Sequence, residues 1–204
     1  MVKLSVVIQA GGKSTRMGED KALIPFVRDT TLIQYILNQI EGLGDERLII
    51  SNDVDKFKFL GLPVFPDVYP QVGSLGGIYS AVHHARYNHC LILACDMPFV
   101  NISLIDYMLT QMDDFDIIMP RWEPEDYTEP FRAIYSKACL DPISKAIEIG
   151  ERRIISFFKY VKIRFIDADE ISKFDPEGLT FFNINTPDEL EQARRLEIIM
   201  REDQ

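Results

Sequence analysis

The sequence predicts a doubly wound α/β fold with a mostly parallel, Rossmann-like sheet and helices on both faces, in a single domain spanning residues 1–204. Short apolar runs alternate along the chain with segments in which apolar residues recur at helical spacing, a pattern typical of buried strands between amphipathic helices. Strands separated by helices favour a parallel sheet that is covered on both sides. With 204 residues, 47% of them hydrophobic, and no repeat or low-complexity linker, the chain is sized for one sizeable core.

The expected elements follow one another in a regular order. The first strand is Leu4–Gln9, and the most continuous apolar run, 90–95, predicts a central strand because both faces of such a strand are buried. Leucine and isoleucine at helical spacing predict a helix over 31–43. The other expected strands are 47–51, 62–66, 115–119, 131–135 and 162–167, and the other expected helices are 78–86, 102–112, 137–149, 154–159 and 187–200. The polar, acidic stretch 121–129 is expected to be an exposed loop.

Composition argues against several classes of protein. A formal net charge of −10 repels nucleic acid, so we expect no DNA or RNA partner. No apolar run approaches the roughly 18 residues of a membrane span, and no signal peptide with a small-residue cleavage site is visible. Cys90, Cys95 and Cys139 fit no metal-binding spacing and no even disulfide framework. We therefore expect a cytoplasmic protein with reduced thiols and no membrane contact.

A glycine turn with the sequence QAGG follows the first strand at 9–12. It is not a P-loop, because Val7 stands where that motif needs a glycine, and the residues after the turn also break the dinucleotide-binding glycine pattern. Arg16 and Lys21 follow on the same loop, against the negative background of the chain. Arginine grips phosphate oxygens in a bidentate manner and lysine supplies a point charge. The turn indicates a phosphate-binding site, with a solvated basic loop as the alternative.

Polar residues follow several of the expected strands, at the sheet edge where ligands of α/β proteins bind. Asn52 follows the second strand and Asp67 the third, although either could be a helix cap or turn former. A second glycine loop, 73–77, opens the next helix and could face a base or a sugar. Asp96 follows the central strand. It could hold Mg²⁺, which takes one or two protein oxygens plus phosphates and waters, or it could cap a helix.

The segment 182–190 is expected to end a strand and start the last helix. Thr186 is a good N-cap and Glu189 occupies the capping-box position three residues later, so these two residues are explained by capping. Asn183 and Asn185 are left over, on a strand end that faces the same crevice as Asp96.

Together these residues resemble the molybdenum cofactor guanylyltransferase (MobA-like) family of nucleotidyltransferases, which has a Rossmann-like fold. The chain matches five patterns of that family in order: LAGGxSxRMGxDKAL at 9–23, GPLAGI at 73–78, CDxP at 95–98, EPLxALY at 129–135 and FxNINTPEDL at 181–190. Gln9 replaces the usual leucine, and Ser74 and Gly76 replace proline and alanine.

The resemblance implies a reaction and a set of site residues. GTP and molybdopterin would be the substrates, Mg²⁺ the cofactor, and a guanine dinucleotide cofactor and pyrophosphate the products. Transient contact with other cofactor-pathway proteins or apo-molybdoenzymes would follow. The implied nucleotide-binding residues are Gln9, Ala10, Gly11, Gly12, Lys21, Asn52, Asp67 and Asp96. The expected catalytic residues are Arg16, Lys21 and Asp96, with Asp96 also holding the metal. The acceptor should lie toward the second half of the chain, where the candidates are Arg132, Asn183, Asn185, Arg152 and Arg153; for each of the three arginines a plain surface charge is the alternative.

Two other functions stay open at this point. A related nucleotidyltransferase of the same fold would use CTP or a sugar-phosphate acceptor. A nucleotide-binding module without turnover would need no metal-bound transfer site, which the combination of Arg16, Lys21 and Asp96 argues against.

Overall fold

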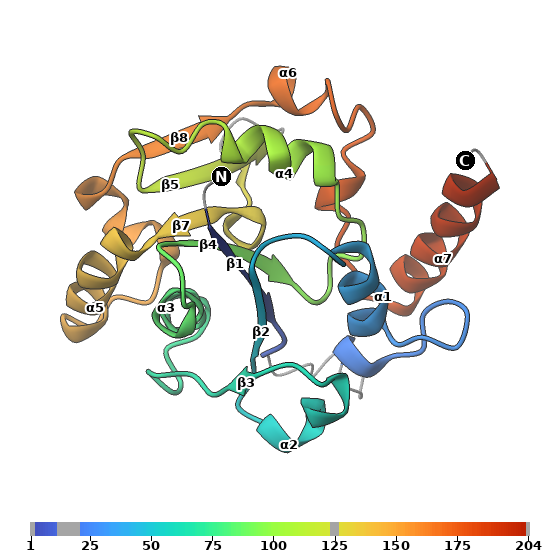
Figure 1. Ribbon diagram of the computed structural model, residues 1–204, viewed down its shortest axis with the longest axis horizontal. Coiled ribbons are helices and arrows are strands. Elements are labelled where there is room, and N and C mark those ends of the chain that lie inside the picture. Colours follow the sequence, from blue (N-terminus) through green and yellow to red (C-terminus); the bar gives the residue numbers. More distant parts are fainter. Residues whose placement is uncertain (1–2, 12–20, 123–126, 203–204) are drawn as a thin grey trace.

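The computed structural model describes residues 3–11, 21–122 and 127–202, and within them it contains an eight-stranded sheet. The strands are β1 (Leu4–Gln9), β2 (Glu46–Ile50), β3 (Val64–Phe65), β4 (His89–Ala94), β5 (Ile117–Trp122), β6 (Tyr127–Thr128), β7 (Ile134–Ser136) and β8 (Ile163–Ile166). Their order is β3-β2-β1-β4-β7-β5-β6, with β8 paired to β5. Only β6 and β7 of these run antiparallel to their neighbours. The expected mostly parallel sheet is confirmed (Figure 1).

Helices cover both faces of the sheet, as expected (Figure 1). Alternate residues of β1 point to opposite sides, so Leu4, Val6 and Ile8 join one core cluster and Val7 joins the other. The first cluster takes its helical residues mainly from α1 and α4, and the second from α3 and α5. The α-helices are α1 (Leu32–Gln39), α2 (Val54–Phe57), α3 (Ser74–His84), α4 (Ile102–Leu109), α5 (Leu140–Glu148), α6 (Ala168–Ile171) and α7 (Pro187–Glu202). The 3-10 helices are η1 (Lys21–Leu23), η2 (Lys58–Leu60), η3 (Pro130–Arg132), η4 (Lys137–Cys139), η5 (Ile154–Tyr160) and η6 (Leu179–Phe181).

The expectation of an exposed loop over 121–129 is wrong at both ends. Arg121 and Trp122 extend β5, which pairs with Tyr127 and Thr128 of β6. Trp122 stacks on Phe181 with 5.4 Å between the ring centroids. Glu129 is buried, with 6% of its surface exposed. The stacking of Trp122 and the burial of Glu129 hold the two ends of this segment against the rest of the protein. The acidic composition of the stretch gives no sign of either contact.

Two further boundaries differ from expectation near the site. The segment before α7 is not a strand but the 3-10 helix η6 followed by an irregular stretch. Helix α3 begins at Ser74 rather than at residue 78, so Gly76 and Gly77 belong to its first turn. A Cβ at Gly76 would lie 2.9 Å from Val72 Cβ, so glycine is needed here for close packing.

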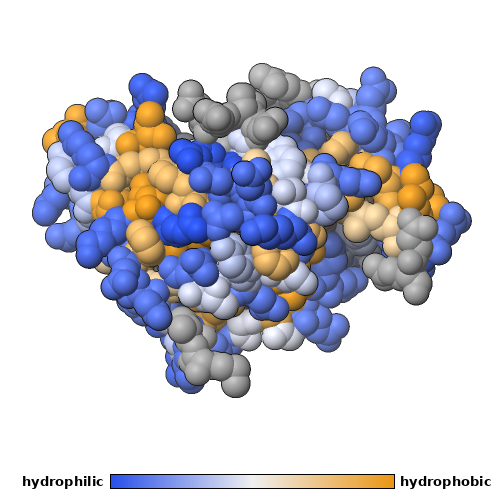
Figure 2. Space-filling model, turned by 90° about the horizontal axis from the view of Figure 1, so that it is seen from above, coloured by the Kyte–Doolittle hydropathy of each residue, from blue (hydrophilic) through white to orange (hydrophobic). Residues whose placement is uncertain are grey.

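The face of the molecule seen in Figure 2 is mostly hydrophilic, with apolar groups gathered toward its left and right ends. Among the described residues, Ile149 is exposed just after α5, Ile155 and Tyr160 are exposed on η5, and Ile198 and Ile199 are exposed on α7. No helix in the described part of the chain has the length and hydrophobicity needed to cross a membrane.

Candidate active site

Three side chains that are distant in sequence meet at the carboxyl edge of the sheet. The Lys21 ammonium donates a hydrogen bond to Asn185 Oδ1 at 2.7 Å and lies 3.3 Å from Asp96 Oδ2. The side chains of Lys21 and Asp96 are 16% and 27% exposed, so the ion pair is partly shielded from water. We call this group, Lys21, Asp96 and Asn185, the lysine clasp. It brings together residues that the sequence analysis had assigned to phosphate, metal and acceptor binding.

Backbone hydrogen bonds anchor the segments that carry Asp96 and Asn185. The amide of Cys95 donates to the carbonyl of Gln9 at 3.2 Å, which ties the end of β4 to the end of β1. The amide of Ile184 donates to the Asp96 carbonyl at 2.8 Å, which anchors the segment that carries Asn185. Asn101 rather than Asp96 caps the following helix α4, accepting from the Leu104 amide at 2.9 Å. The alternative interpretation of Asp96 as a helix cap is therefore wrong.

The segment that leads from Asn185 into α7 is capped as the sequence predicts. Glu189 N donates to Thr186 Oγ1 at 3.2 Å, and Glu189 Oε2 accepts from the amides of Thr186 and Asn185 at 2.8 and 2.6 Å. These hydrogen bonds, with that from Asn185 the strongest cause, lower the pKa of Glu189. The capping box thus also orients the backbone at Asn185.

Next to the clasp, a cleft of about 780 Å³ opens along the same sheet edge. Its size is within the range of small-molecule binding sites. Its lining residues are Gln9, Ala10, Gly11, Ser51, Asn52, Asp53, Asp67, Gln71, Gly73, Ser74 and Phe131. The structure therefore brings together every sequence-predicted nucleotide-binding residue between 9 and 67 that it describes, apart from Lys21 in the clasp. Gly12 and Arg16 lie outside the described residues.

Asn52 and Asp67 hold each other at the mouth of the cleft. Asn52 Nδ2 donates to Asp67 Oδ2 at 2.7 Å, and the Asp67 amide donates to Asn52 Oδ1 at 3.0 Å. The pair cross-links the loops after β2 and β3, so both side chains act as one polar rim.

Unpaired polar atoms concentrate around the cleft and the clasp. Buried side-chain atoms are nearly always hydrogen-bonded in native proteins, so each exception needs an explanation. Among the described residues, six buried side-chain atoms have no hydrogen-bond partner. Four belong to predicted site residues, namely Gln9 Oε1, Asp67 Oδ1, Asn183 Oδ1 and Arg132 Nη1, and the other two are Ser136 Oγ and Ser156 Oγ.

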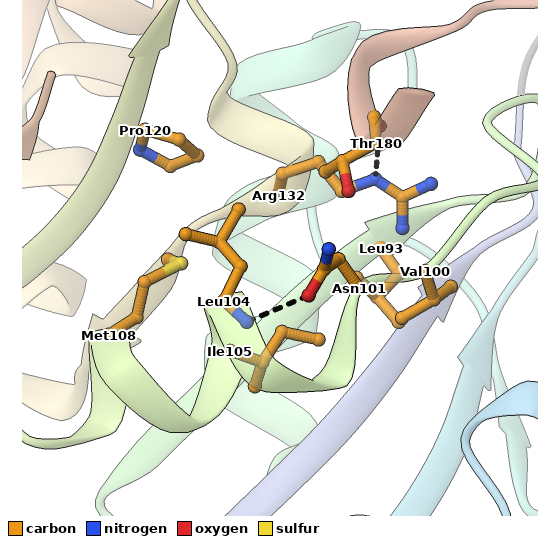
Figure 3. Close-up of a pocket in the computed structure, with 9 residues that line it drawn as sticks. All are labelled: Leu93, Val100, Asn101, Leu104, Ile105, Met108, Pro120, Arg132 and Thr180. Carbon is orange, nitrogen blue, oxygen red and sulfur yellow. Dashed lines mark hydrogen bonds between the residues drawn. The ribbon is translucent and has the colours of Figure 1, made fainter. Parts of the chain in front are cut away.

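Arg132 lies beneath the site rather than at its surface, which differs from the expected role as a phosphate ligand for the acceptor. Only 3% of its surface is exposed. Its guanidinium donates to the Thr180 carbonyl at 3.2 Å (Figure 3) and also to the Met97 carbonyl. Burial lowers the pKa of Arg132 to about 10, so the group stays charged at neutral pH. Arg132 thus braces the turn after Asp96 against the segment that leads to Asn185.

A small cavity of about 10 Å³ lies beside Arg132, between α4 and the end of β5 (Figure 3). It has room for one water molecule and none for a substrate. Its apolar lining comes from Leu93, Val100, Leu104, Ile105 and Met108. The cavity belongs to the core behind the site and not to the site itself.

Arg152 and Arg153 are exposed on the loop between α5 and η5. Helix α5 packs on α3, and Ser144 in its middle contacts the Tyr69 hydroxyl at 3.2 Å, just before the cleft loop. Since α5 starts at the amino edge after β7 and runs past this contact, its end lies toward the cleft side. Both arginines therefore stay candidates for binding the acceptor.

The donor set fits a hard divalent cation. No group of three or more histidine, cysteine or acidic residues that could hold a metal exists in the part of the chain that the structure describes. Asp96 offers a carboxylate that is partly accessible. Asn183 adds an unpaired amide oxygen, in the segment whose Ile184 amide donates to the Asp96 carbonyl. Mg²⁺ is usually bound by one or two protein oxygens, and phosphates and waters complete its coordination.

Sequence reasoning missed Gln71 and Phe131, which also line the cleft. Gln71 has a φ of 66°, a left-handed conformation that a glutamine seldom adopts. Nothing in its sequence context signals this. Phe131 could have been predicted as a cleft residue, because it belongs to the EPFRAIY stretch that matches a family pattern.

A family model for the MobA-like NTP transferase domain matches residues 6–163. The chain belongs to the MobA-like NTP transferase family. This MobA-like chain is 37% identical over 198 residues to a Clostridium perfringens (strain 13) protein named "Probable molybdenum cofactor guanylyltransferase", covering 94% of this chain and 96% of the relative. A protein of the same name from Pelotomaculum thermopropionicum is 34% identical over 195 residues, covering 95% and 93%.

Solved structures agree with this membership. The MobA-like chain superimposes with a TM-score of 0.81 on molybdopterin-guanine dinucleotide biosynthesis protein A from Archaeoglobus fulgidus, at 27% identity, covering 95% of this chain and 98% of that one. A CMP:2-keto-3-deoxy-manno-octonic acid synthetase has the same fold, with a TM-score of 0.69 at 15% identity. The MobA-like chain is thus a nucleotidyltransferase by family, and the predicted fold class is confirmed.

Proposed function

We propose that the protein transfers GMP from GTP to molybdopterin, forming a guanine dinucleotide cofactor and releasing pyrophosphate. The observation that carries the proposal is the lysine clasp, which presents a cation and a carboxylate beside a nucleotide-sized cleft. The names of the relatives, similar over nearly their whole length, support this choice of substrates.

The reaction needs no general base. The attacking group is a terminal phosphate oxygen of the pterin, which is already anionic at neutral pH. The three histidines of the chain agree with this, because His83 and His84 end α3 and His89 begins β4, at the amino edge of the sheet. Catalysis then depends on charge neutralisation and in-line positioning at the α-phosphate.

Residues of the clasp and the turn supply that charge. Lys21 would turn its ammonium from Asp96 to the phosphates, and Arg16 would neutralise the leaving pyrophosphate. Asp96, aided by the oxygen of Asn183, would hold Mg²⁺, which when bound neutralises charge on the phosphate oxygens. Gln9, Ala10, Gly11 and Gly12 would line the nucleotide, and the Asn52–Asp67 rim would lie near its base or ribose.

The acceptor would approach from the second half of the chain. Asn185 closes one side of the clasp, and Arg152 and Arg153 offer exposed positive charge on the side where α5 ends. Arg132 would act by supporting the turn after Asp96, without touching the acceptor.

We also propose a cytoplasmic location, with transient contacts to other proteins of the cofactor pathway. Cys90, Cys95 and Cys139 are free thiols, as in proteins of a reducing compartment. GTP is likewise a cytoplasmic substrate.

A calorimetric titration of GTP, CTP and ATP with Mg²⁺, followed by pyrophosphate release on adding molybdopterin, tests the proposal. GTP should bind most tightly, because a site that pairs the guanine edge leaves buried groups unpaired with another base. Tighter binding of CTP would favour the related cytidylyltransferase function. Nucleotide binding without pyrophosphate release would favour a binding module.

A further inference from the structure

The carboxylate of Asp96 has a cation of the protein itself beside it. The Lys21 ammonium lies 3.3 Å from Asp96 Oδ2, and both side chains are partly shielded from solvent. Water and salt screen such a pair less than they screen an ion pair on the open surface. The carboxylate that is expected to hold Mg²⁺ therefore already has a positive charge in contact with it.

Asn185 holds the ammonium in this position from the other side. Its Oδ1 accepts a hydrogen bond from Lys21 at 2.7 Å, and its backbone amide donates to Glu189 Oε2 at 2.6 Å. The Ile184 amide, one residue earlier, donates to the Asp96 carbonyl at 2.8 Å. The two acceptors that face the ammonium thus belong to segments that are hydrogen-bonded to each other. The fold itself fixes the place at which Lys21 meets Asp96.

Two other lysine–carboxylate pairs show how an exposed contact of this kind differs from the lysine clasp. Lys145 Nζ lies 3.5 Å from Asp141 Oδ2 on α5, and these side chains are 74% and 87% exposed. Lys58 pairs with Asp55 in a similarly exposed position. Exposed pairs of this kind contribute little free energy, so they have little influence on other ions. They provide matched controls for the pair in the clasp.

A divalent cation competes with the Lys21 ammonium for the Asp96 carboxylate. Mg²⁺ contacts its oxygen ligands directly, at about 2.1 Å, so an ion held by Asp96 lies close to the ammonium. At about 4 Å, repulsion between a divalent ion and an ammonium lowers affinity roughly tenfold or more, even in bulk water. The described residues contain no group of three or more histidine, cysteine or acidic side chains that could offset this loss.

We propose that the lysine clasp is an autoinhibitory contact, which keeps divalent metal from Asp96 until a nucleotide draws Lys21 away. The triphosphate offers the ammonium a more highly charged partner than one carboxylate, and Asp96 is then free to bind metal together with the phosphates. This inference rests on the proposed function, since it assumes a nucleotide in the cleft and metal at Asp96. Metal and nucleotide binding are then coupled, and each raises the affinity of the other by the same factor.

Mn²⁺ binding to the nucleotide-free protein, followed by electron paramagnetic resonance, tests this contact without any reaction. Lys21→Met removes the charge but keeps a long side chain, so Mn²⁺ affinity should rise about tenfold or more. Lys21→Arg retains the charge and should bind Mn²⁺ as weakly as the wild type. Lys145→Met is the matched control, because it changes the net charge equally but releases an exposed carboxylate. Its Mn²⁺ affinity should equal that of the wild type.

A double variant, Lys21→Met with Asp96→Asn, shows whether the metal gained is held by Asp96. It should lose the Mn²⁺ affinity that Lys21→Met gains. A gain that persists without the carboxylate would overturn the inference, as would equal Mn²⁺ affinities of the wild type and Lys21→Met. Lys21→Gln provides a second uncharged variant if circular dichroism shows that Lys21→Met does not fold.

The same titration with saturating nucleotide, corrected for the Mn²⁺ that free nucleotide binds, separates this inference from the proposed function. GTP should raise the Mn²⁺ affinity of the wild type, and this enhancement should be about tenfold smaller in Lys21→Met. If CTP but not GTP produces the enhancement, the autoinhibitory contact stands and the proposed substrate is wrong. If the wild type transfers GMP but Lys21→Met binds Mn²⁺ no more tightly without nucleotide, the proposed function stands and the contact is not inhibitory.

Discussion

Both edges of the sheet contain a hollow lined with polar side chains, about 780 Å³ at the carboxyl edge and about 500 Å³ at the amino edge. At the amino edge, Asp116 Oδ2 accepts from the Lys162 amide at 2.8 Å, and Asn88 Nδ2 contacts His89 Nε2 at 3.0 Å. Ser136 Oγ is the one buried side-chain atom there, among the described residues, without a partner. At the carboxyl edge, the acceptors of Gln9, Asp67 and Asn183 are all unpaired.

The two edges thus differ in hydrogen bonding. Polar side chains at the amino edge are mostly paired within the protein, whereas several at the carboxyl edge have no partner among the described residues. Both hollows measure several hundred Å³ and are lined by polar side chains, so neither property alone identifies the site. The completeness of the hydrogen bonding distinguishes the two edges, because a polar group that is already paired within the protein has few hydrogen bonds left for a substrate. The following variants test whether this criterion separates function from structure.

The largest effect is expected for Asp96→Asn at the carboxyl edge. The variant keeps the shape of the side chain but removes its charge, so turnover should fall roughly a thousandfold while the fold survives. The Mg²⁺ dependence of GTP binding, measured by calorimetry, should largely disappear. Asp116→Asn is the matched variant at the amino edge. It should keep wild-type turnover, and a similar loss of activity in both variants would contradict the distinction between the edges.

Lys21→Ala should lower turnover by roughly a hundredfold, since it removes one positioned cation from the developing phosphate charge. Steady-state pyrophosphate release measures the effect, with circular dichroism to verify folding. Lys162→Ala removes a lysine that lines the amino-edge hollow and should have no effect on the rate. Near-normal turnover in a folded Lys21→Ala variant would mean that the clasp is structural.

Arg132→Met probes the support beneath the carboxyl edge. It leaves the carbonyls of Met97 and Thr180 without their donor, so the free energy of unfolding should fall by about 3 kcal/mol. The turn after Asp96 should also lose its alignment, lowering kcat roughly tenfold with little change in GTP affinity. Arg132→Lys should recover part of kcat. A destabilised variant with wild-type kcat would restrict Arg132 to the stability of the fold.

The smallest effect concerns the pH dependence of the cap at Glu189. Its pKa in the folded protein is below the ordinary value of 4.5, so its stabilising contribution is present above that pH and is lost as pH falls through the folded pKa. Glu189→Gln retains an acceptor oxygen without the charge and should cost under about 1 kcal/mol at neutral pH. Thermal unfolding should show this difference shrinking below pH 4.5. A difference that grows on acidification would contradict the assigned cause.

The sequence predicts the sheet and the carboxyl-edge residues well, because both depend on local patterns. Apolar runs mark the strands, and the residues directly after β1, β2, β3 and β4 must meet at one edge once the strands are parallel. Asp96 and Asn185 could be assigned to that edge before their contact with Lys21 was visible, although the stretch before Asn185 proved to be irregular rather than a strand.

What the sequence does not reveal is the direction in which a polar side chain turns. Arg132 stands in a motif beside the site, yet its guanidinium points inward to backbone carbonyls. The acidic composition of 121–129 likewise gives no sign that Trp122 stacks on Phe181 or that Glu129 is buried. These outcomes depend on partners far along the chain, which local periodicity does not encode.

The lysine clasp has a consequence for the synthesis of the protein. The two partners of Lys21 lie 75 and 164 residues further along the chain. Ile24 and Phe26, just after the lysine, pack with Ile184 and Leu190 in one cluster. A nascent chain can pair β1, β2 and β4 long before Asn185 has left the ribosome, but it cannot close the clasp. The complete clasp therefore forms late in the synthesis of each molecule.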